Sequence, residues 1–90
     1  MWIKAQNGKS ILNTENYDRI AISQENEGEY LVAAVKDYVE LPGLTRFRAA
    51  MRKAGSYKEL EAAQDVLAEI YGQIAADSKV YEMPADRSGA

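Results

Sequence analysis

The chain has 90 residues, no cysteine and no histidine, and a formal net charge of −3 from 11 basic and 14 acidic side chains. This length accommodates one domain with a thin core, so assembly into a homo-oligomer, a dimer or larger, is a natural supplement. Without cysteine and histidine there are no disulfide bonds, thiolate nucleophiles, common zinc sites or histidine general bases; we therefore expect a protein that is not an enzyme and holds no metal or cofactor.

The first part of the chain is expected to form short strands separated by turns. Asn7-Gly8 lies between residues 2–6 and 9–13, and this dipeptide is typical of a type I′ hairpin because both residues tolerate positive φ. In the segment 19–23, isoleucines two positions apart predict a half-buried strand. A hairpin followed by a third strand is therefore expected at the N-terminal end.

Two further segments are expected to add strands to the same sheet. Residues 30–35 form a continuous apolar run, which favours a central strand covered on both faces, although a piece of buried helix has the same pattern. Residues 38–41 predict a short edge strand that ends at Pro42-Gly43. For residues 45–54 both strand and helix fit the spacing of the apolar residues, and we favour the strand.

The second half contains the clearest helical pattern. Ser56-Tyr57-Lys58-Glu59 matches a capping box, in which the serine hydroxyl and the glutamate satisfy the first free amides of a helix. Apolar residues then recur at helical spacing to about Ala76, where Asp77-Ser78 predicts the end; they are Leu60, Ala63, Leu67, Ile70, Tyr71 and Ile74. Residues 79–83 predict a final strand before Pro84, and residues 85–90 predict a flexible tail.

These elements predict an α+β fold in one domain, residues 1–84. The expected architecture is a small antiparallel β-meander of five to six strands, with one long helix packed on it and a short final strand. Trp2 is expected in the core or in an oligomer contact, because large aromatic residues dominate both. Gly72 lies inside the helix, where glycine costs stability, and suggests close approach of a second helix.

Four short motifs are distinctive. They are Met1-Trp2-Ile3-x-x-Gln6-x-Gly8, Gly55-Ser56-Tyr57, Val66-Leu67-x-Glu69-Ile70 and Lys79-Val80-Tyr81-Glu82-Met83-Pro84. Together they resemble a family of small uncharacterised proteins of Gram-positive bacteria, their phages and other mobile elements. The likeness covers most of the chain apart from residues 36–50, and it departs at Ala5, often serine in the family, and at Ala54, often leucine. The resemblance implies a sheet-plus-helix fold and a mobile-element setting, and it brings no catalytic residues.

Basic side chains are concentrated in one segment. Residues 41–58 carry five cations and no acid, so the remaining residues carry a net charge of −8. Arginine binds phosphates in bidentate geometry, and a helix start attracts anions. Aromatic rings in the same segment could stack on a base. The residues expected to bind such a ligand are Arg46, Phe47, Arg48, Arg52, Lys53, Ser56, Tyr57 and Lys58.

The same charges have a simpler interpretation. Arg46, Arg48 and Arg52 could form the solvated face of an edge strand, or they could pair with acidic side chains on the outer face of the helix. Those acids are Glu59, Glu61, Asp65 and Glu69. Tyr57 could equally be a packing residue at the helix start rather than a ligand platform.

Two functional hypotheses follow. In the first, which we favour, a small homo-oligomer of phage or mobile-element origin sequesters a phosphorylated small molecule, such as a nucleotide immune signal of the host, as a counter-defence. In the second, the chain is an interaction module or inhibitor that binds a host defence or regulatory protein through its acidic surface. A chain with net negative charge is not expected to bind long nucleic acid. Without a signal peptide or an apolar span we expect the cytoplasm and no membrane binding.

Overall fold

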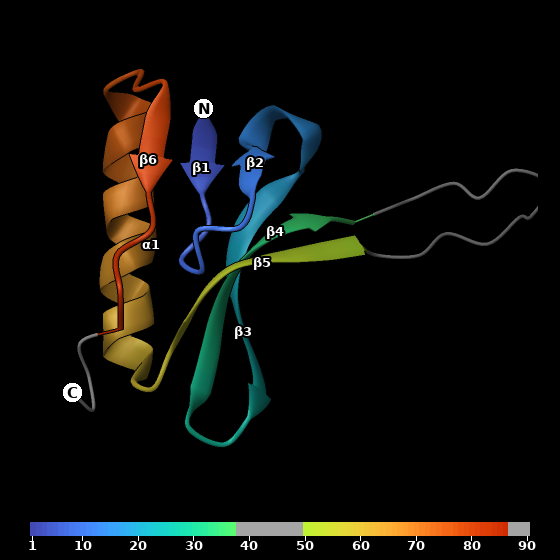
Figure 1. The fold of residues 1–90 in the computed structure, drawn as a ribbon, viewed down its shortest axis with the longest axis vertical. Helices are drawn as coiled ribbons and strands as arrows, with labels where there is room; N and C mark the ends of the chain where they lie inside the picture. Colours follow the sequence, from blue (N-terminus) through green and yellow to red (C-terminus); the bar gives the residue numbers. More distant parts are fainter. Residues whose placement is uncertain (38–49, 87–90) are drawn as a thin grey trace, which may run out of the picture.

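A computed structural model describes residues 1–37 and 50–86 and confirms the α+β fold (Figure 1). The expected edge strand at 38–41, Pro42-Gly43 and the start of the 45–54 segment lie outside these described residues. Within them, the elements in chain order are β1 (Trp2–Lys4), β2 (Ile11–Asn13), a 3-10 turn (Thr14–Asn16), β3 (Arg19–Asn26), β4 (Glu29–Lys36), β5 (Ala50–Tyr57), α1 (Leu60–Ala75) and β6 (Val80–Glu82).

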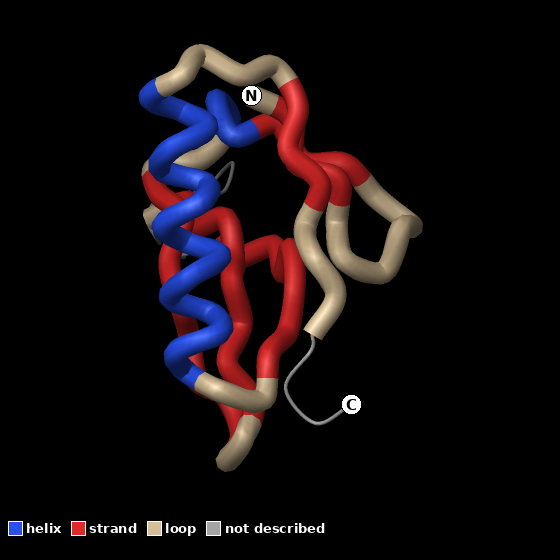
Figure 2. The backbone as a smooth tube through the Cα atoms, turned by 90° about the vertical axis from the view of Figure 1, so that its left-hand side faces the viewer, coloured by secondary structure: helices blue, strands red, loops and turns tan. Residues whose placement is uncertain are grey.

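The strands form two small sheets rather than one continuous meander. One sheet has the order β2-β1-β6, and the other has the order β3-β4-β5. β6 pairs with β1 in parallel, with Ile3 opposite Tyr81, whereas the other described pairings are antiparallel. Parallel neighbours in a sheet require a crossover connection. Between β1 and β6 this connection contains α1, which follows β5 and precedes β6 in the chain. Figure 2 shows α1 running along one face of the β3-β4-β5 sheet.

The predicted N-terminal hairpin is present, but its turn is different. Ile3 lies opposite Leu12 as the hairpin requires. A type I′ turn needs positive φ at both central residues, and only Gly8, at φ 73°, has it. The connection is longer, since the amide of Ala5 donates to the carbonyl of Ser10 at 2.9 Å. Asn7 instead uses its side chain, whose Oδ1 accepts from the amide of Lys9 at 2.8 Å.

The two central expectations for the larger sheet are confirmed. β4 lies between β3 and β5, and its run Leu31–Val35 is buried throughout, as expected for a strand covered on both faces. The described part of the 45–54 segment is a strand, β5, and not a helix. β5 contains an irregularity at Ala54, because Val32 pairs with Gly55 while Ala33 pairs with Lys53.

The core joins both sheets and the helix. The helix contributes Ala63, Val66 and Ile70 to it. The remaining buried residues of the cluster come from the strands and the segment after β6; they are Ile3, Leu12, Val32, Ala34, Ala54, Tyr57 and Met83. Buried apolar area is the main favourable term for a domain of this size, so the two sheets depend on the same helix for their burial.

The start of the helix does not follow the predicted capping box. α1 begins at Leu60, and its N-cap, Glu59, makes no side-chain hydrogen bond to the first turn. Ser56 is instead part of β5, where it lies opposite Leu31. The pairing of β5 with β4 extends to Tyr57, which leaves the serine unavailable as a cap. Strand pairing here overrides a local helix-start signal.

The end of the helix is as predicted, and the structure adds its geometry. The amide of Ser78 donates to the carbonyl of Gln73 at 2.9 Å, and the amide of Asp77 donates to Ile74 at 3.0 Å. Asp77 has a left-handed φ of 57°. This combination is a Schellman motif, which satisfies the last carbonyls of the helix.

The predicted apolar stripe of α1 is only partly buried. Ala63 and Ile70 face the core, whereas Leu60, Tyr71 and Ile74 are exposed by 43%, 76% and 52%. The helix is thus rotated so that one apolar flank faces outward. No helix in the described ranges is long and apolar enough to cross a membrane.

Candidate functional site

Among the described residues, the basic side chains that were predicted to bind a ligand do not come together in one site. Arg46, Phe47 and Arg48 lie outside the described residues. Arg52 and Lys53 are exposed neighbours on β5, and adjacent residues of a strand project to opposite faces. Arg52 and Lys53 therefore cannot hold one small ligand together.

The next predicted residues, Ser56 to Lys58, have structural partners. Ser56 uses its backbone amide and carbonyl to bind the side chain of Gln6. Tyr57 is 2% exposed, and its hydroxyl donates to the carbonyl of Pro84 at 2.7 Å. The amide of Lys58 donates to Oδ2 of Asp86 at 3.0 Å, so the predicted tail is held against the body at this residue. The buried ring of Tyr57 is a packing residue, which agrees with the simpler of the two interpretations given to this tyrosine from the sequence.

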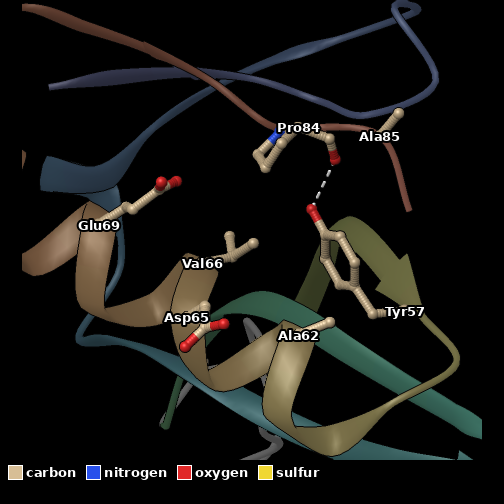
Figure 3. A pocket seen from close by; sticks show the side chains of 7 residues that line it. All are labelled: Tyr57, Ala62, Asp65, Val66, Glu69, Pro84 and Ala85. Carbon is tan, nitrogen blue, oxygen red and sulfur yellow. Dashed lines mark hydrogen bonds between the residues drawn. The ribbon is translucent and has the colours of Figure 1, made fainter. Parts of the chain in front are cut away.

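Tyr57 also forms one wall of a pocket of about 340 Å³ (Figure 3). The pocket lies between the first half of α1 and the segment that follows β6. Its apolar surface comes from Ala62, Val66, Pro84 and Ala85. Two carboxylates of α1, Asp65 and Glu69, complete the lining. These two residues are four positions apart, so the helix places them on the same face, one turn from each other.

The pocket is acidic. None of its seven lining residues is basic. Burial, with the nearby carboxylates of Asp86 and Glu69, raises the pKa of Tyr57 to about 12. Glu69 also accepts a hydrogen bond of 2.6 Å at Oε2 from the hydroxyl of Tyr81. Burial and this bond raise the pKa of Tyr81 as well. Near neutral pH the tyrosines are therefore protonated, and the pocket offers acceptors and negative charge.

Within residues 1–37 and 50–86, no ion pair joins an acid of α1 to Arg52, and the other two expected cations, Arg46 and Arg48, lie outside these residues. In this part of the chain, ion pairs join Lys4 to Glu82 at 3.6 Å and Arg19 to Asp37 at 2.9 Å. Neither involves an acid of the helix. The start of α1 is itself acidic, with Glu59 at the N-cap and Glu61 in the first turn, and this charge already complements the helix dipole. A phosphate would be repelled there.

Sequence reasoning recognised the acids of the helix as a surface but missed the pocket. The spacing of Asp65 and Glu69 places them on one face, and that signal is visible in the sequence. The opposite wall depends on Pro84 meeting Tyr57, a contact between distant segments that no local pattern predicts. Within the described ranges, no cluster of three or more acidic side chains could hold a metal ion.

No family model matches the chain, and no curated protein or solved structure matches it either.

Proposed function

We propose that the chain is a non-catalytic protein-interaction module that binds a basic side chain of a partner protein in the pocket beside Tyr57. One observation carries this proposal: the pocket combines an apolar floor with two carboxylates and no cation. This is the second of the two hypotheses drawn from the sequence, given a defined location. In that hypothesis the partner is a defence or regulatory protein of a host cell.

The shape of the pocket suits a lysine or arginine. The long aliphatic stem of either residue packs on apolar surface while its charged end stays near water. Val66 and Pro84 supply that surface, and Asp65 and Glu69 lie where the charged end would be. Hydrogen bonds between such a cation and a carboxylate are about twice as strong as neutral ones. Arginine has the further advantage that its planar fork can meet a carboxylate with two bonds.

Charge along the helix extends the recognition beyond one side chain. Glu61 lies one turn before Asp65, and Glu69 lies one turn after it, so three acids follow one side of α1. A row of like charges steers an oppositely charged segment towards the surface and raises the association rate. Single exposed ion pairs contribute only up to about 1 kcal/mol, so the stem in the pocket is needed for affinity. The fitting partner is therefore an exposed basic segment of another protein.

We rank sequestration of a phosphorylated small molecule second. It rests on the basic segment, of which Arg52, Lys53 and Lys58 are described, and the adjacent Arg52 and Lys53 project to opposite faces of β5. An origin in a phage or another mobile element is also a proposal, because it rests on the resemblance of the four sequence motifs. Homo-oligomer formation is compatible with either function.

The proposal can be tested with defined peptides. A library of nine-residue peptides that contain one central arginine or lysine is titrated into isotope-labelled protein, and amide chemical shifts are followed by NMR. Binding peptides should shift the amides of residues 62–69 and 85–86. Replacement of the central arginine by citrulline, which keeps the shape and removes the charge, should weaken binding about tenfold, equal to about 1.4 kcal/mol.

Matched variants identify the site. Asp65→Asn combined with Glu69→Gln should weaken binding of the arginine peptide about tenfold, whereas Glu25→Gln, on an exposed part of β3 and outside the acidic row of α1, should change it less than about twofold. Cyclic di- and trinucleotides should leave the melting temperature unchanged. If a nucleotide stabilises the protein, or if the double variant binds the peptide as tightly as the parent does, the proposal is wrong.

A further inference from the structure

One flank of α1 exposes large apolar side chains outside the candidate site. Leu60, Tyr71 and Ile74 are exposed by 43%, 76% and 52%. Leu67 and Gln64 lie between them on the same side, because residues three, four and seven apart share a helix face. We call these five residues the uncharged flank. Beside it, Ile20 of β3 continues the apolar surface into a shallow groove of about 280 Å³.

The charges of the helix are segregated from this flank. Glu61, Asp65 and Glu69 are the ionisable side chains of α1 apart from Tyr71, and the helical repeat places all three on the opposite flank. The chain as a whole has a net charge of −3, so two copies repel each other through most of their surface. On the uncharged flank they can approach without placing like charges opposite each other. This flank is therefore suited to a second copy of the chain.

We infer that two copies associate through the uncharged flank, with their α1 helices antiparallel about a two-fold axis. In such an interface the same patch of each copy is used. An axis near Leu67 brings Leu60 of one copy opposite Ile74 and Ala75 of the other, and Gln64 opposite Tyr71. Leu67 lies opposite itself. The apolar side chains of one helix then lie opposite apolar side chains of the other, so that the two helix surfaces can interdigitate.

The size of the flank sets the strength of the dimer. A helix of 16 residues is about 24 Å long, and a strip of it about 10 Å wide gives a few hundred Å² for each copy. Stable interfaces bury about 800 Å² for each partner. The dimer is accordingly weak and depends on protein concentration. The groove at Ile20 adds area without adding charge.

A second exposed apolar patch is less suited to the same role. Trp2, Ile11 and Val80 are exposed by 46%, 62% and 65% on the outer face of the β2-β1-β6 sheet. That face also carries Lys4 and Glu82, whose side chains form an ion pair at 3.6 Å. An interface there would remove two charges from water, at a cost that their attraction does not reliably repay.

Sedimentation equilibrium of the full chain over a range of concentrations tests the inference. The mass should rise from that of one 10.0 kDa chain towards twice that value as concentration increases. Tyr71→Glu places a charge in the centre of the flank and should shift the midpoint of this rise at least about tenfold upward in concentration. Gly72→Glu is the matched control, since it adds the same charge one position along, where a new Cβ has no neighbour within 4 Å.

NMR spectra at increasing concentration locate the interface. Concentration-dependent shifts should fall on the amides around Gln64, Leu67 and Tyr71. A chain that stays monomeric at the highest concentration, or that dimerises equally well with Tyr71→Glu, overturns the inference. Shifts confined to Trp2, Ile11 and Val80 overturn it too, because they assign the dimer to the other patch. Circular dichroism of each variant verifies that the helix is retained.

Discussion

The side-chain amide of Gln6 binds both backbone groups of Ser56. Its Oε1 accepts from the amide of Ser56 at 2.9 Å, and its Nε2 donates to the carbonyl of the same residue at 3.1 Å. The same Nε2 is 3.2 Å from the carbonyl of Pro84. One side chain thus takes the place of a neighbouring strand at the edge of β5, and it joins the N-terminal hairpin to β5 and to the segment after β6.

Loss of this connection should destabilise the fold. Gln6→Ala leaves the partly buried amide and carbonyl of Ser56 without their partners, and we expect the free energy of unfolding to fall by about 2 kcal/mol. Chemical denaturation monitored by tyrosine and tryptophan fluorescence measures the change. Gln24→Ala, on an exposed part of β3, is the control and should change stability by less than about 0.5 kcal/mol. Equal effects of the two variants would contradict the role of Gln6.

Gly55 is closely packed against Met83 and Tyr57. A Cβ at this position would lie 3.0 Å from Cε of Met83 and 3.2 Å from Oη of Tyr57. Met83 is buried and the tyrosine hydroxyl is hydrogen-bonded, so neither can move freely, and Gly55→Ala should lower the melting temperature and cost about 1–2 kcal/mol. Gly72→Ala is the counterpart, because nothing lies within 4 Å of its Cβ. There the helix should gain about 0.5–1 kcal/mol. A neutral Gly55→Ala would show that the pocket wall is loosely packed.

Tyr57 should make stability depend on alkaline pH. The folded protein holds the phenol proton up to a pKa of about 12, whereas the unfolded chain loses it near 10. Between pH 10 and 12 the unfolded state therefore binds fewer protons, and the free energy of unfolding falls as the pH rises. We expect a fall of about 1 kcal/mol from this group, less than the full shift implies, because water near the pocket screens the charges.

Comparison with Tyr57→Phe isolates that contribution. At pH 7 the variant lacks the hydrogen bond to Pro84 and should be less stable by about 1 kcal/mol. Because phenylalanine does not ionise, the gap between the two proteins should narrow from pH 10 to pH 12. Urea denaturation at pH 7, 10 and 11.5 measures it. A gap that is constant with pH would show that the phenol has an ordinary pKa.

The start of α1 can be improved. Glu59 has the extended backbone of an N-cap, with φ −114° and ψ 134°, but its side chain makes no capping hydrogen bond. Serine at this position can accept from the amides of the first turn, so Glu59→Ser should stabilise the protein by about 0.5–1 kcal/mol. Lys58→Ser, one residue earlier, serves as the control and should give no gain. Thermal denaturation distinguishes the two, and equal melting temperatures would argue against Glu59 as the N-cap.

Patterns within one segment predicted the elements of this fold well. The continuous apolar run of β4 indicated a strand buried on both faces, and Leu31–Val35 are buried. The Asn7-Gly8 pair indicated the first hairpin, and Asp77-Ser78 indicated the end of the helix. Each of these signals depends on backbone preferences or on a repeat of apolar residues within about ten positions, and in these three places the pairing of distant segments agrees with the local preference.

Relationships between distant segments could not be predicted in the same way. The capping box at Ser56 failed because this residue lies in β5, opposite Leu31 of β4, and its backbone binds the side chain of Gln6. The division into two sheets follows from β6 pairing with β1, which their short apolar patterns do not specify. The candidate pocket was missed for the same reason, since Tyr57 and Pro84 meet across 27 residues of chain.

The position of β1 between β2 and β6 has a consequence for biosynthesis. Trp2–Lys4 are synthesised long before one of their two neighbours, Val80–Glu82, which follows them in the chain after four other described strands and α1. During translation the hairpin of β1 and β2 is an isolated pair of strands, which is marginally stable in water. The smaller sheet therefore closes only after β6 has been synthesised, so this part of the fold cannot form progressively from its N-terminal strands.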